Sequence, residues 1–416
     1  MKTKAKKQKK LVPELRFPGF FGEWENLGFY ETADSILDFR GRTPLKLGME
    51  WGGSISSLSA LNVKKGYIDF ELDPHMGSEE LYKKWMTKGD LSKGDILLTM
   101  EAPLGNVALV PDNKKYILSQ RVLALKTINS VNSWFLYHLM IDGRFQSKIN
   151  QLSTGSTAKG INQRSLKKVK VILPKLVEQK KIASFLSIVD EKIGKMEKKK
   201  LALVEYKKGV MQKIFSRNLP AGRQVRFKDD GGKSFPDWEE KKLGEISDIN
   251  PKAKKLPDHF VYIDLESVVD GKLIKENRID LIGSPSRAQR LLEKKDILFQ
   301  LVRPYQKNNY FFDRDGEYIA STGYAQIRFD GNQRFLYQYL HNQEFVNLVL
   351  SRCTGTSYPA INSSDLSRIN VWVPSLNEQK KIAEFLTVID EKIKVVDGEI
   401  ESAKEWKRGL LQKMFV

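Results

Sequence analysis

The sequence has little of what disulfides and zinc sites are made from. Its 416 residues include one cysteine, Cys353, which excludes an intrachain disulfide and fits a reducing, cytoplasmic setting. The four histidines are too scattered to predict a zinc site. The chain also lacks an apolar run of about 18 residues, so no membrane-spanning helix is predicted.

Motifs of several enzyme classes are missing as well. No GxxxxGK[ST] phosphate loop is present. Asn250-Pro251 is followed by Lys252, so the Asn/Asp-Pro-Pro-aromatic motif of DNA methyltransferases stops at its second residue. Asp270-Gly-Lys272 loosely matches part of a nuclease metal site, but Asp-Gly is more typical of a turn. We therefore expect no catalytic residue, no metal and no bound cofactor in this chain.

Positive charge is in excess. Lysine and arginine total 70 against 51 aspartate and glutamate, a formal net charge of +19. Such an excess favours a polyanionic partner, and nucleic acid is the usual one. The first ten residues, MKTKAKKQKK, lead into no apolar segment, so they predict a solvated basic arm or a non-specific phosphate contact rather than a signal peptide.

One phrase occurs twice. EQKKIASFLSIVDEKI at 178–193 returns as EQKKIAEFLTVIDEKI at 378–393, an offset of 378 − 178 = 200 residues. At the same offset, Thr154-Gly155 and Ile161-Asn162 recur as Thr354-Gly355 and Ile361-Asn362. Further upstream the halves diverge, apart from matches such as Asp95-Ile96-Leu97 with Asp296-Ile297-Leu298. Each half thus has a variable part followed by a nearly constant part.

The constant part predicts a long helix. Apolar residues recur in steps of three and four, which is typical of a coiled-coil seam, and Lys200, Lys207 and Lys407 interrupt it. The variable parts predict mixed α and β structure, with one helix running from Asn132 towards Ile149 and its counterpart carrying Phe335–Leu350. The predicted strands are Ile96–Met100, Val107–Val110, Arg121–Lys126, Lys168–Ile172, Asp296–Phe299 and Ala325–Phe329.

These patterns predict the following organisation: a basic tail (1–10), a first variable domain (11–172), a central helix (173–216), a linker (217–224), a second variable domain (225–372) and a C-terminal helix (373–416).

The arrangement resembles the specificity (S) subunit of type I restriction-modification systems. The residues that carry the resemblance are the Thr-Gly and Ile-Asn pairs, followed by Leu173-Pro-Lys-Leu-Val-Glu-Gln-Lys-Lys-Ile182 and its copy at 373–382. The resemblance implies two mixed α/β target recognition domains, related by a pseudo-twofold axis and joined by an antiparallel coiled coil. Each domain would read one half of a bipartite double-stranded DNA target, and the coiled coil would set the spacing.

The resemblance also implies partners. Two methyltransferase (M) subunits would hold S-adenosylmethionine and methylate adenine, and restriction (R) subunits would add ATP- and Mg-dependent cleavage. Two alternatives stay open: a freestanding DNA methyltransferase or nuclease, and a non-specific DNA-binding coiled-coil scaffold.

Candidate DNA-contacting residues combine side chains suited to base edges and phosphates. In the first domain they are Arg40, Arg42, Thr43, Gln120, Arg121 and Lys159. In the second domain they are Arg303, Tyr305, Gln306, Lys307, Asn308, Asn309, Tyr324 and Tyr358. For the loops that carry Lys159 and Tyr358, a purely structural role is an equal alternative to DNA contact.

The repeated Glu-Gln-Lys-Lys suggests a surface for two copies of one partner protein. Its residues are Glu178, Gln179, Lys180 and Lys181 in one copy and Glu378, Gln379, Lys380 and Lys381 in the other. The alternative is that these residues only start and solvate the helices.

Overall fold

The computed structural model describes residues 11–156, 158–216, 224–253 and 255–416. The expected basic tail and residues 217–223 of the expected linker lie outside the described residues. The chain divides into two compact units: unit 1 is Met1–Glu197 with Gly398–Val416, and unit 2 is Lys198–Asp397. Within the described ranges, no helix is long and apolar enough to cross a membrane.

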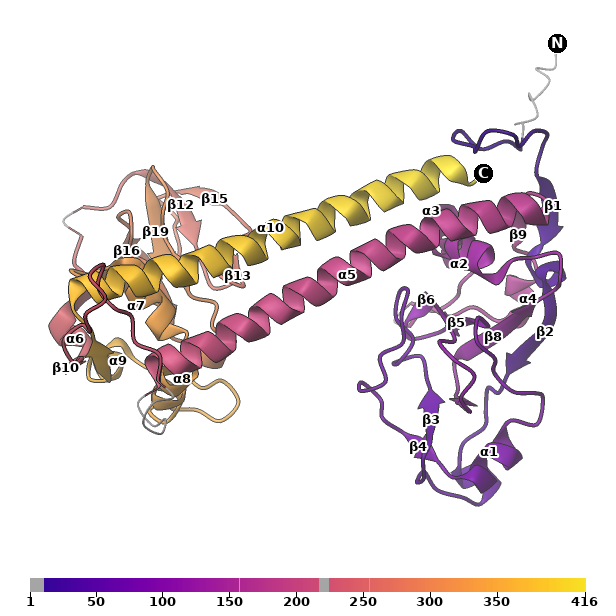
Figure 1. Ribbon diagram of the computed structural model, residues 1–416, viewed down its shortest axis with the longest axis horizontal. Coiled ribbons are helices and arrows are strands. Elements are labelled where there is room, and N and C mark those ends of the chain that lie inside the picture. The colour runs from indigo at the N-terminus through magenta and orange to yellow at the C-terminus, as the bar shows by residue number, and fades with distance from the viewer. Residues whose placement is uncertain (1–10, 157, 217–223, 254) are drawn as a thin grey trace, which may run out of the picture. The chain divides into compact units, whose positions relative to one another are not determined.

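An antiparallel sheet in the order β2-β8-β5-β6 is central to unit 1 (Figure 1). Its strands are β2 (Ala33–Asp38), β8 (Val122–Thr127), β5 (Ile96–Met100) and β6 (Leu104–Leu109). Every residue of β5 is buried, as a central strand requires. Ile96 and Leu98 face one hydrophobic core, while Leu97 faces a second core on the other side. This alternation follows from the two-residue period of a strand.

The remaining short elements of unit 1 surround this sheet. They are β1 (Glu25–Gly28) paired with β9 (Lys170–Leu173), β4 (Met76–Gly77) beside β3 (Ile55–Leu58) and β7 (Ile117–Leu118), and the helices α1 (Glu79–Trp85), α2 (Ser133–Ile141), α3 (Gly143–Gln151) and α4 (Gln163–Leu166).

Unit 2 repeats the central sheet in the order β11-β20-β17-β18. Its strands are β11 (Ser247–Ile249), β20 (Tyr324–Phe329), β17 (Ile297–Gln300) and β18 (Tyr310–Phe311). A second sheet in the order β15-β12-β19-β16 repeats the pairing of β4-β3-β7 in unit 1, with one antiparallel and one parallel neighbour for its middle strand, and adds β16 at the edge. Its strands are β15 (Asn277–Asp280), β12 (His259–Ile263), β19 (Tyr318–Ser321) and β16 (Ala288–Leu291). The two halves therefore diverge in sequence around a shared arrangement of two sheets, to which unit 2 adds β16.

The other elements of unit 2 are short. They are β10 (Glu239–Lys242) paired with β21 (Asn370–Val373), β13 (Val268–Val269) paired with β14 (Lys272–Leu273), and the helices α6 (Leu243–Ile246), α7 (Gln333–Leu340), α8 (Gln343–Leu350) and α9 (Ser363–Ser367).

The helical segment after each central sheet is broken in two. The prediction of one helix from Asn132 towards Ile149 was wrong, because Asp142 is extended and its carboxylate accepts a hydrogen bond from the backbone N–H of Arg144. That bond caps a new helix, α3. Asn342 does the same between α7 and α8, where one helix was also expected. The first caps, Asn132 and Asn332, were predicted correctly.

The two long helices are α5 (Leu176–Phe215) and α10 (Leu376–Met414), and each runs from one unit into the other. Within unit 1 they pair antiparallel, since Asp190 and Glu197 of α5 contact Lys407 and Lys404 of α10 (Figure 1). Within unit 2 the pairs are Lys207–Asp390 and Lys200–Asp397.

The lysines that interrupt the apolar seam therefore each find a carboxylate across the helix pair. Lys200, Lys207 and Lys407 all donate to aspartates of the facing helix. The antiparallel pairing expected from the resemblance is present in each unit.

The C-terminal end of each long helix is buried in one unit's core. The Phe415 ring lies 6.5 Å from that of Trp24 and 5.2 Å from that of Phe135. In unit 2, Phe215 packs in the same way against Trp238 and Phe335. Trp24 and Trp238 are thus core anchors.

Candidate nucleic-acid interface

The repeated Thr-Gly and Ile-Asn pairs build one loop in each unit. In unit 1, Thr154 and Gly160 exchange backbone hydrogen bonds of 2.9 Å, and the N–H of Ile161 donates to the carbonyl of Met100 at the end of β5. Gly155 has a φ of +105°, and a Cβ there would lie 2.3 Å from the carbonyl oxygen of Ala158. Only glycine fits this turn.

The same loop is built in unit 2. Thr354 and Ala360 exchange backbone hydrogen bonds, and Ile361 donates to Leu301 at the end of β17. In both units the asparagine after the isoleucine caps the following short helix. The repeated Thr-Gly and Ile-Asn pairs therefore hold the loop to the central sheet, and the residues between the two pairs are free to differ.

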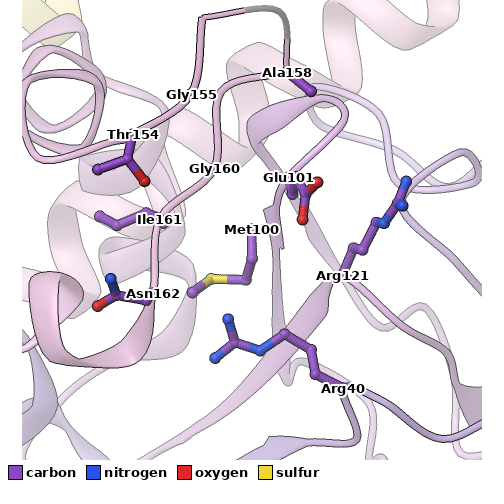
Figure 2. Close-up of a pocket in the computed structure, with 10 residues that line it drawn as sticks. All are labelled: Arg40, Met100, Glu101, Arg121, Thr154, Gly155, Ala158, Gly160, Ile161 and Asn162. Atoms are coloured by element: carbon purple, nitrogen blue, oxygen red, sulfur yellow. The ribbon is translucent and has the colours of Figure 1, made fainter.

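A cavity of about 340 Å³ opens beside the loop of unit 1. Figure 2 shows Arg40, Glu101 and Arg121 extending from three segments around this opening, opposite the loop from Thr154 to Asn162. Arg121 is exposed, and its guanidinium makes no hydrogen bond or ion pair with the described residues. Two arginines and one carboxylate around an opening of this size can meet both acceptors and donors of base edges.

Arg40 is only partly available. Its guanidinium donates to Asp38 at 2.8 Å, and Asp38 also accepts a hydrogen bond of 2.6 Å from Gln163. Burial alone would raise the pKa of Asp38, but the hydrogen bonds from Arg40 and Gln163 hold that pKa below its ordinary value. The aspartate is thus charged at neutral pH and fixes the guanidinium at the rim of the cavity.

Other predicted residues of unit 1 have structural roles. Arg42 donates to the carbonyls of Lys84 and Trp85, and its own carbonyl accepts a hydrogen bond from Gln120. Thr43 accepts a hydrogen bond from the backbone of Lys46. The expectation that these side chains contact DNA does not fit these bonds, because each would have to give up a partner inside the unit. Lys159 is exposed in the loop, so its prediction stands.

In unit 2, two predicted residues meet. The guanidinium carbon of Arg303 lies 4.2 Å from the centre of the Tyr358 ring, and this tyrosine is 62% exposed. Tyr305 is 49% exposed in the 3₁₀ turn Pro304–Gln306 that follows Arg303. Gln306 is exposed as well, but its side-chain oxygen accepts a hydrogen bond from Gln300. Arg303, Tyr305 and Tyr358 thus form the accessible group.

Four predicted residues of unit 2 are buried or bonded within the unit, which does not fit the expected contact with DNA. Tyr324 is fully buried in a core cluster, and burial raises the pKa of its phenol. The side chain of Asn309 is buried and accepts from the backbone of Gln300. Asn308 accepts from the backbone of Asp270, and Lys307 donates to the carbonyl of His341. Lys307, Asn308 and Asn309 thus stabilise the turn, and Tyr324 belongs to the core.

The Glu-Gln half of each repeated phrase is buried, so it does not form the expected partner surface. Glu178 pairs with Arg16 at 2.8 Å in unit 1, and Glu378 pairs with Arg226 at 2.8 Å in unit 2. The next residue ties the helix start to the domain. Gln179 donates to the carbonyl of Pro174 and accepts from the backbone of Asn132, and Gln379 does the same with Pro374 and Asn332.

The lysines of the phrase differ between the copies. Lys180 and Lys380 are exposed, Lys181 lies 5.6 Å from the Phe17 ring centre, and Lys381 pairs with Asp230 at 2.6 Å. The phrase is therefore repeated largely because both helices must begin in the same way, which was the alternative reading of it.

Sequence reasoning missed Glu101 of the cavity. Ile96–Met100 was predicted as a strand, and Glu101 is the residue that follows it. Pro103 and Pro304 have the same offset as Asp95 and Asp296, so the match between the halves continues past the strand. This longer match is the signal that could have pointed to the turn that carries Glu101. A residue at the end of a central strand beside a turn is well placed for binding.

The comparisons with known proteins agree with this architecture. The family model described as "Type I restriction modification DNA specificity domain" matches residues 55–206 and 236–405, one copy in each half of the chain. The chain belongs to this family. Both copies of the specificity domain include the Thr-Gly and Ile-Asn loop and most of the following long helix.

Curated relatives share most of their length with this member of the specificity-domain family. The MjaVIII specificity subunit of Methanocaldococcus jannaschii is 27% identical over 338 residues, which cover 77% of this chain and 78% of the relative. The MjaIX specificity subunit of the same organism is 24% identical and covers 90% of this chain and 89% of its own length. Both are named type I restriction enzyme specificity subunits.

Solved structures support the fold. The S subunit of the M. genitalium type I restriction-modification system aligns with a TM-score of 0.59 at 18% identity, over 97% of this chain and 99% of that one. A chain from a study of type I complex assembly aligns with a TM-score of 0.52 at 17% identity, over 97% and 99%. The specificity-domain family therefore accounts for both units and both long helices.

Proposed function

We propose that this chain is the DNA-reading subunit of a type I restriction-modification complex. Unit 1 reads one half of a bipartite target and unit 2 reads the other half, and the paired helices set the distance between the halves. The chain itself carries out no catalysis. The observation that supports the proposal most directly is the loop pair: one scaffold, built by the same backbone bonds in both units, carries different side chains in each.

Physical chemistry explains why such an arrangement suits the task. Base edges are read by side chains with fixed positions, while phosphate contacts only set register. Two half-sites of different sequence need two different sets of side chains on similar supports. The net charge of +19 favours binding to the DNA backbone. A pseudo-twofold relation between the two units would present both loops alike to one duplex.

The proposal can be tested by mapping methylated adenines in DNA from cells that carry this chain and its methyltransferase subunit. We expect a motif of two short specified parts separated by a fixed unspecified spacer. Exchange of the variable part of unit 2 for that of a related chain should change one part and leave the other unchanged. A single continuous motif, or methylation without sequence preference, would refute the two-reader function.

The methyltransferase subunits would dock on the long helices. Ile188 and Val388 are exposed at equivalent positions, and so are Tyr206 and Trp406, each of which is 55% exposed. Exposed apolar side chains at matched positions in the two units suit two copies of one partner. The chemistry of the complex would lie in the partners, with S-adenosylmethionine in the methyltransferase subunits and ATP and Mg in a restriction subunit.

This docking surface is testable by stoichiometry. Trp406→Ala combined with Ile188→Ala should lower the bound methyltransferase from two copies to one per chain, measured by native mass spectrometry. Combining Tyr206→Ala and Val388→Ala should do the same through unit 2. Lys180→Ala is a matched exposed control on the same helix and should leave two copies. Retention of two copies in all variants would refute docking at these residues.

A further inference from the structure

The turn after the central strand carries different residues in the two units. Glu101 bridges to Gly160 in unit 1, and Val302 bridges to Ala360 in unit 2, so these positions correspond. The next residue is Ala102 in unit 1 and Arg303 in unit 2, and both have a positive φ, of 43° and 54°. Both residues therefore have a left-handed φ, and the side chain at that position is a methyl group in one unit and a guanidinium in the other.

The loop opposite differs in step with the turn. The residue two positions before the bridge is Ala158 in unit 1 and Tyr358 in unit 2. Tyr358 is the ring on which Arg303 stacks. Unit 2 thus has an arginine–tyrosine pair where unit 1 has two alanines, and in unit 1 Ala158 lines an open cavity.

The side chain of Arg303 is positioned by its neighbours, but its guanidinium donates no hydrogen bond to the described residues. Its backbone N–H donates to the carbonyl of Pro359 at 2.7 Å, which fixes the start of the side chain. The Tyr358 ring contacts the guanidinium from one side, and no carboxylate or carbonyl among the described residues accepts a hydrogen bond from it. Arg40 in unit 1 differs, since Asp38 neutralises it.

We propose that Arg303, oriented by Tyr358, reads a guanine in the half-site that unit 2 recognises. The inference rests on the proposed function and adds a base and a residue pair to it. A planar guanidinium with its edge free donates two parallel hydrogen bonds to the O6 and N7 of guanine. Unit 1 lacks this contact because both members of the pair are alanine, so its half-site is read by other groups.

A base contact fits Arg303 better than a phosphate contact. Phosphate binding needs only a positive charge within reach, and the flexible exposed lysines of the chain supply that. A stacked guanidinium has lost most of its freedom before DNA arrives, which lowers the entropy lost in forming a bidentate bond. Tyr358 is a positioning residue in this scheme and contacts the base only through Arg303.

The test is a double-mutant cycle in which Arg303 and single bases of the target are changed separately and together. The motif is first mapped for the wild-type complex of the full chain with its methyltransferase subunits. The affinity of the purified complex is then measured for duplexes in which each guanine of the unit 2 half-site is changed in turn to adenine. We expect one position where the wild-type complex loses about 5- to 150-fold in affinity and where Arg303→Ala loses less than about twofold.

The substitutions are chosen to keep the fold. Arg303→Ala removes the guanidinium, and alanine already has a positive φ at the equivalent position of unit 1, Ala102. Tyr358→Leu should weaken discrimination at the same guanine, and Tyr358→Phe should restore it because the ring is kept. Arg334→Ala is a matched control, since Arg334 also stacks on an aromatic ring, Phe311, but is paired with Asp313.

The outcomes separate the inference from the proposed function. If Arg303→Ala keeps every base penalty and only weakens binding to all duplexes alike, Arg303 contacts phosphate and the inference is wrong. A unit 2 half-site without guanine is equally fatal to it, and in both cases the bipartite motif survives. A wild-type complex without a bipartite motif would instead contradict the proposed function.

Discussion

The ammonium of Lys407 lies 2.5 Å from a carboxylate oxygen of Asp190, between the paired helices of unit 1. Lys207 and Asp390 repeat the pair at 2.6 Å in unit 2. A third side chain from the domain reaches each aspartate position: His138 in unit 1 and Gln338 in unit 2. Asp390 thus links the opposing long helix to a helix of its own domain, whereas His138 lies near Asp190 without a hydrogen bond to it.

Removal of the lysine should therefore destabilise unit 2. Lys207→Met keeps the apolar stem but leaves Asp390 with the Gln338 hydrogen bond alone. We expect a loss of about 1–2 kcal/mol in the free energy of unfolding, reduced from the cost of a fully buried pair because Asp390 is partly exposed. Hydrogen exchange in α7 and in the paired helix segments should accelerate.

The neighbouring residue supplies the control. The side chain of Lys208 is 75% exposed, so Lys208→Met should change stability by no more than about 0.5 kcal/mol. Equal effects of the two substitutions would contradict a structural role for the Lys207–Asp390 pair.

His138→Gln should stabilise unit 1. Both ring nitrogens of His138 are buried without a hydrogen-bond partner among the described residues, and Nδ1 lies 3.9 Å from the nearest Asp190 oxygen. Unit 2 already has glutamine at this position, and Gln338 donates to Asp390 at 2.6 Å. We expect a gain of about 1 kcal/mol, seen as a higher melting temperature at pH 7. The reverse substitution, Gln338→His, should lower the melting temperature. A lower melting temperature in both variants would contradict the claim that glutamine suits this position better than histidine.

Mild acid should destabilise unit 2 through His341. Burial lowers the pKa of His341 to about 4, and positive charge on Lys207 and Lys307 also lowers it, against an ordinary value of 6.5. The unfolded chain therefore takes up a proton between pH 6.5 and 4 that the folded unit does not. Stability is fully present above pH 6.5 and falls as the pH drops to 4, by on the order of 3 kcal/mol.

Chemical denaturation at several pH values, followed by hydrogen exchange in α7 and α8, would measure this slope. His341→Gln should flatten the slope between pH 6.5 and 4, whereas substitution of the exposed His259 should leave it unchanged. An unaltered slope in His341→Gln would show that another group carries the acid sensitivity.

Gln379→Ala should cost stability without affecting partner binding. Its side chain donates to Pro374 and accepts from Asn332, so truncation leaves a buried carbonyl and a backbone N–H without partners. The expected loss is about 1–3 kcal/mol. Native mass spectrometry should still find two methyltransferase subunits per chain, and Lys380→Ala should change neither quantity. Loss of one methyltransferase subunit on Gln379→Ala alone would instead support the hypothesis that the Glu-Gln-Lys-Lys residues bind this partner.

The repeat made much of the fold predictable. The strands Ile96–Met100 and Ala325–Phe329, the caps at Asn132 and Asn332, and both long helices follow from apolar period and turn chemistry. The breaks at Asp142 and Asn342 were missed because the apolar pattern continues across them. The second sheet was missed in both units because its strands are short and their sequences do not match between the halves.

The site was less predictable, for a physical reason. A polar side chain in a turn has the same sequence signature whether it faces a ligand or its own backbone. Arg303 and Lys307 lie four residues apart in one turn, yet the first stacks on an exposed ring and the second donates to a buried carbonyl. Only the packing of α8 and of the Thr354–Ala360 loop around the turn separates them.

Unit 1 is assembled from both ends of the chain, and this has a consequence for biosynthesis. Residues 198–397 of unit 2 have all been synthesised while Phe415 is still to be added. Trp24 and Phe135 must wait for that ring through the synthesis of almost the entire protein. A stop codon between positions 398 and 415 would therefore leave the later-made unit intact and the first-made unit unfinished.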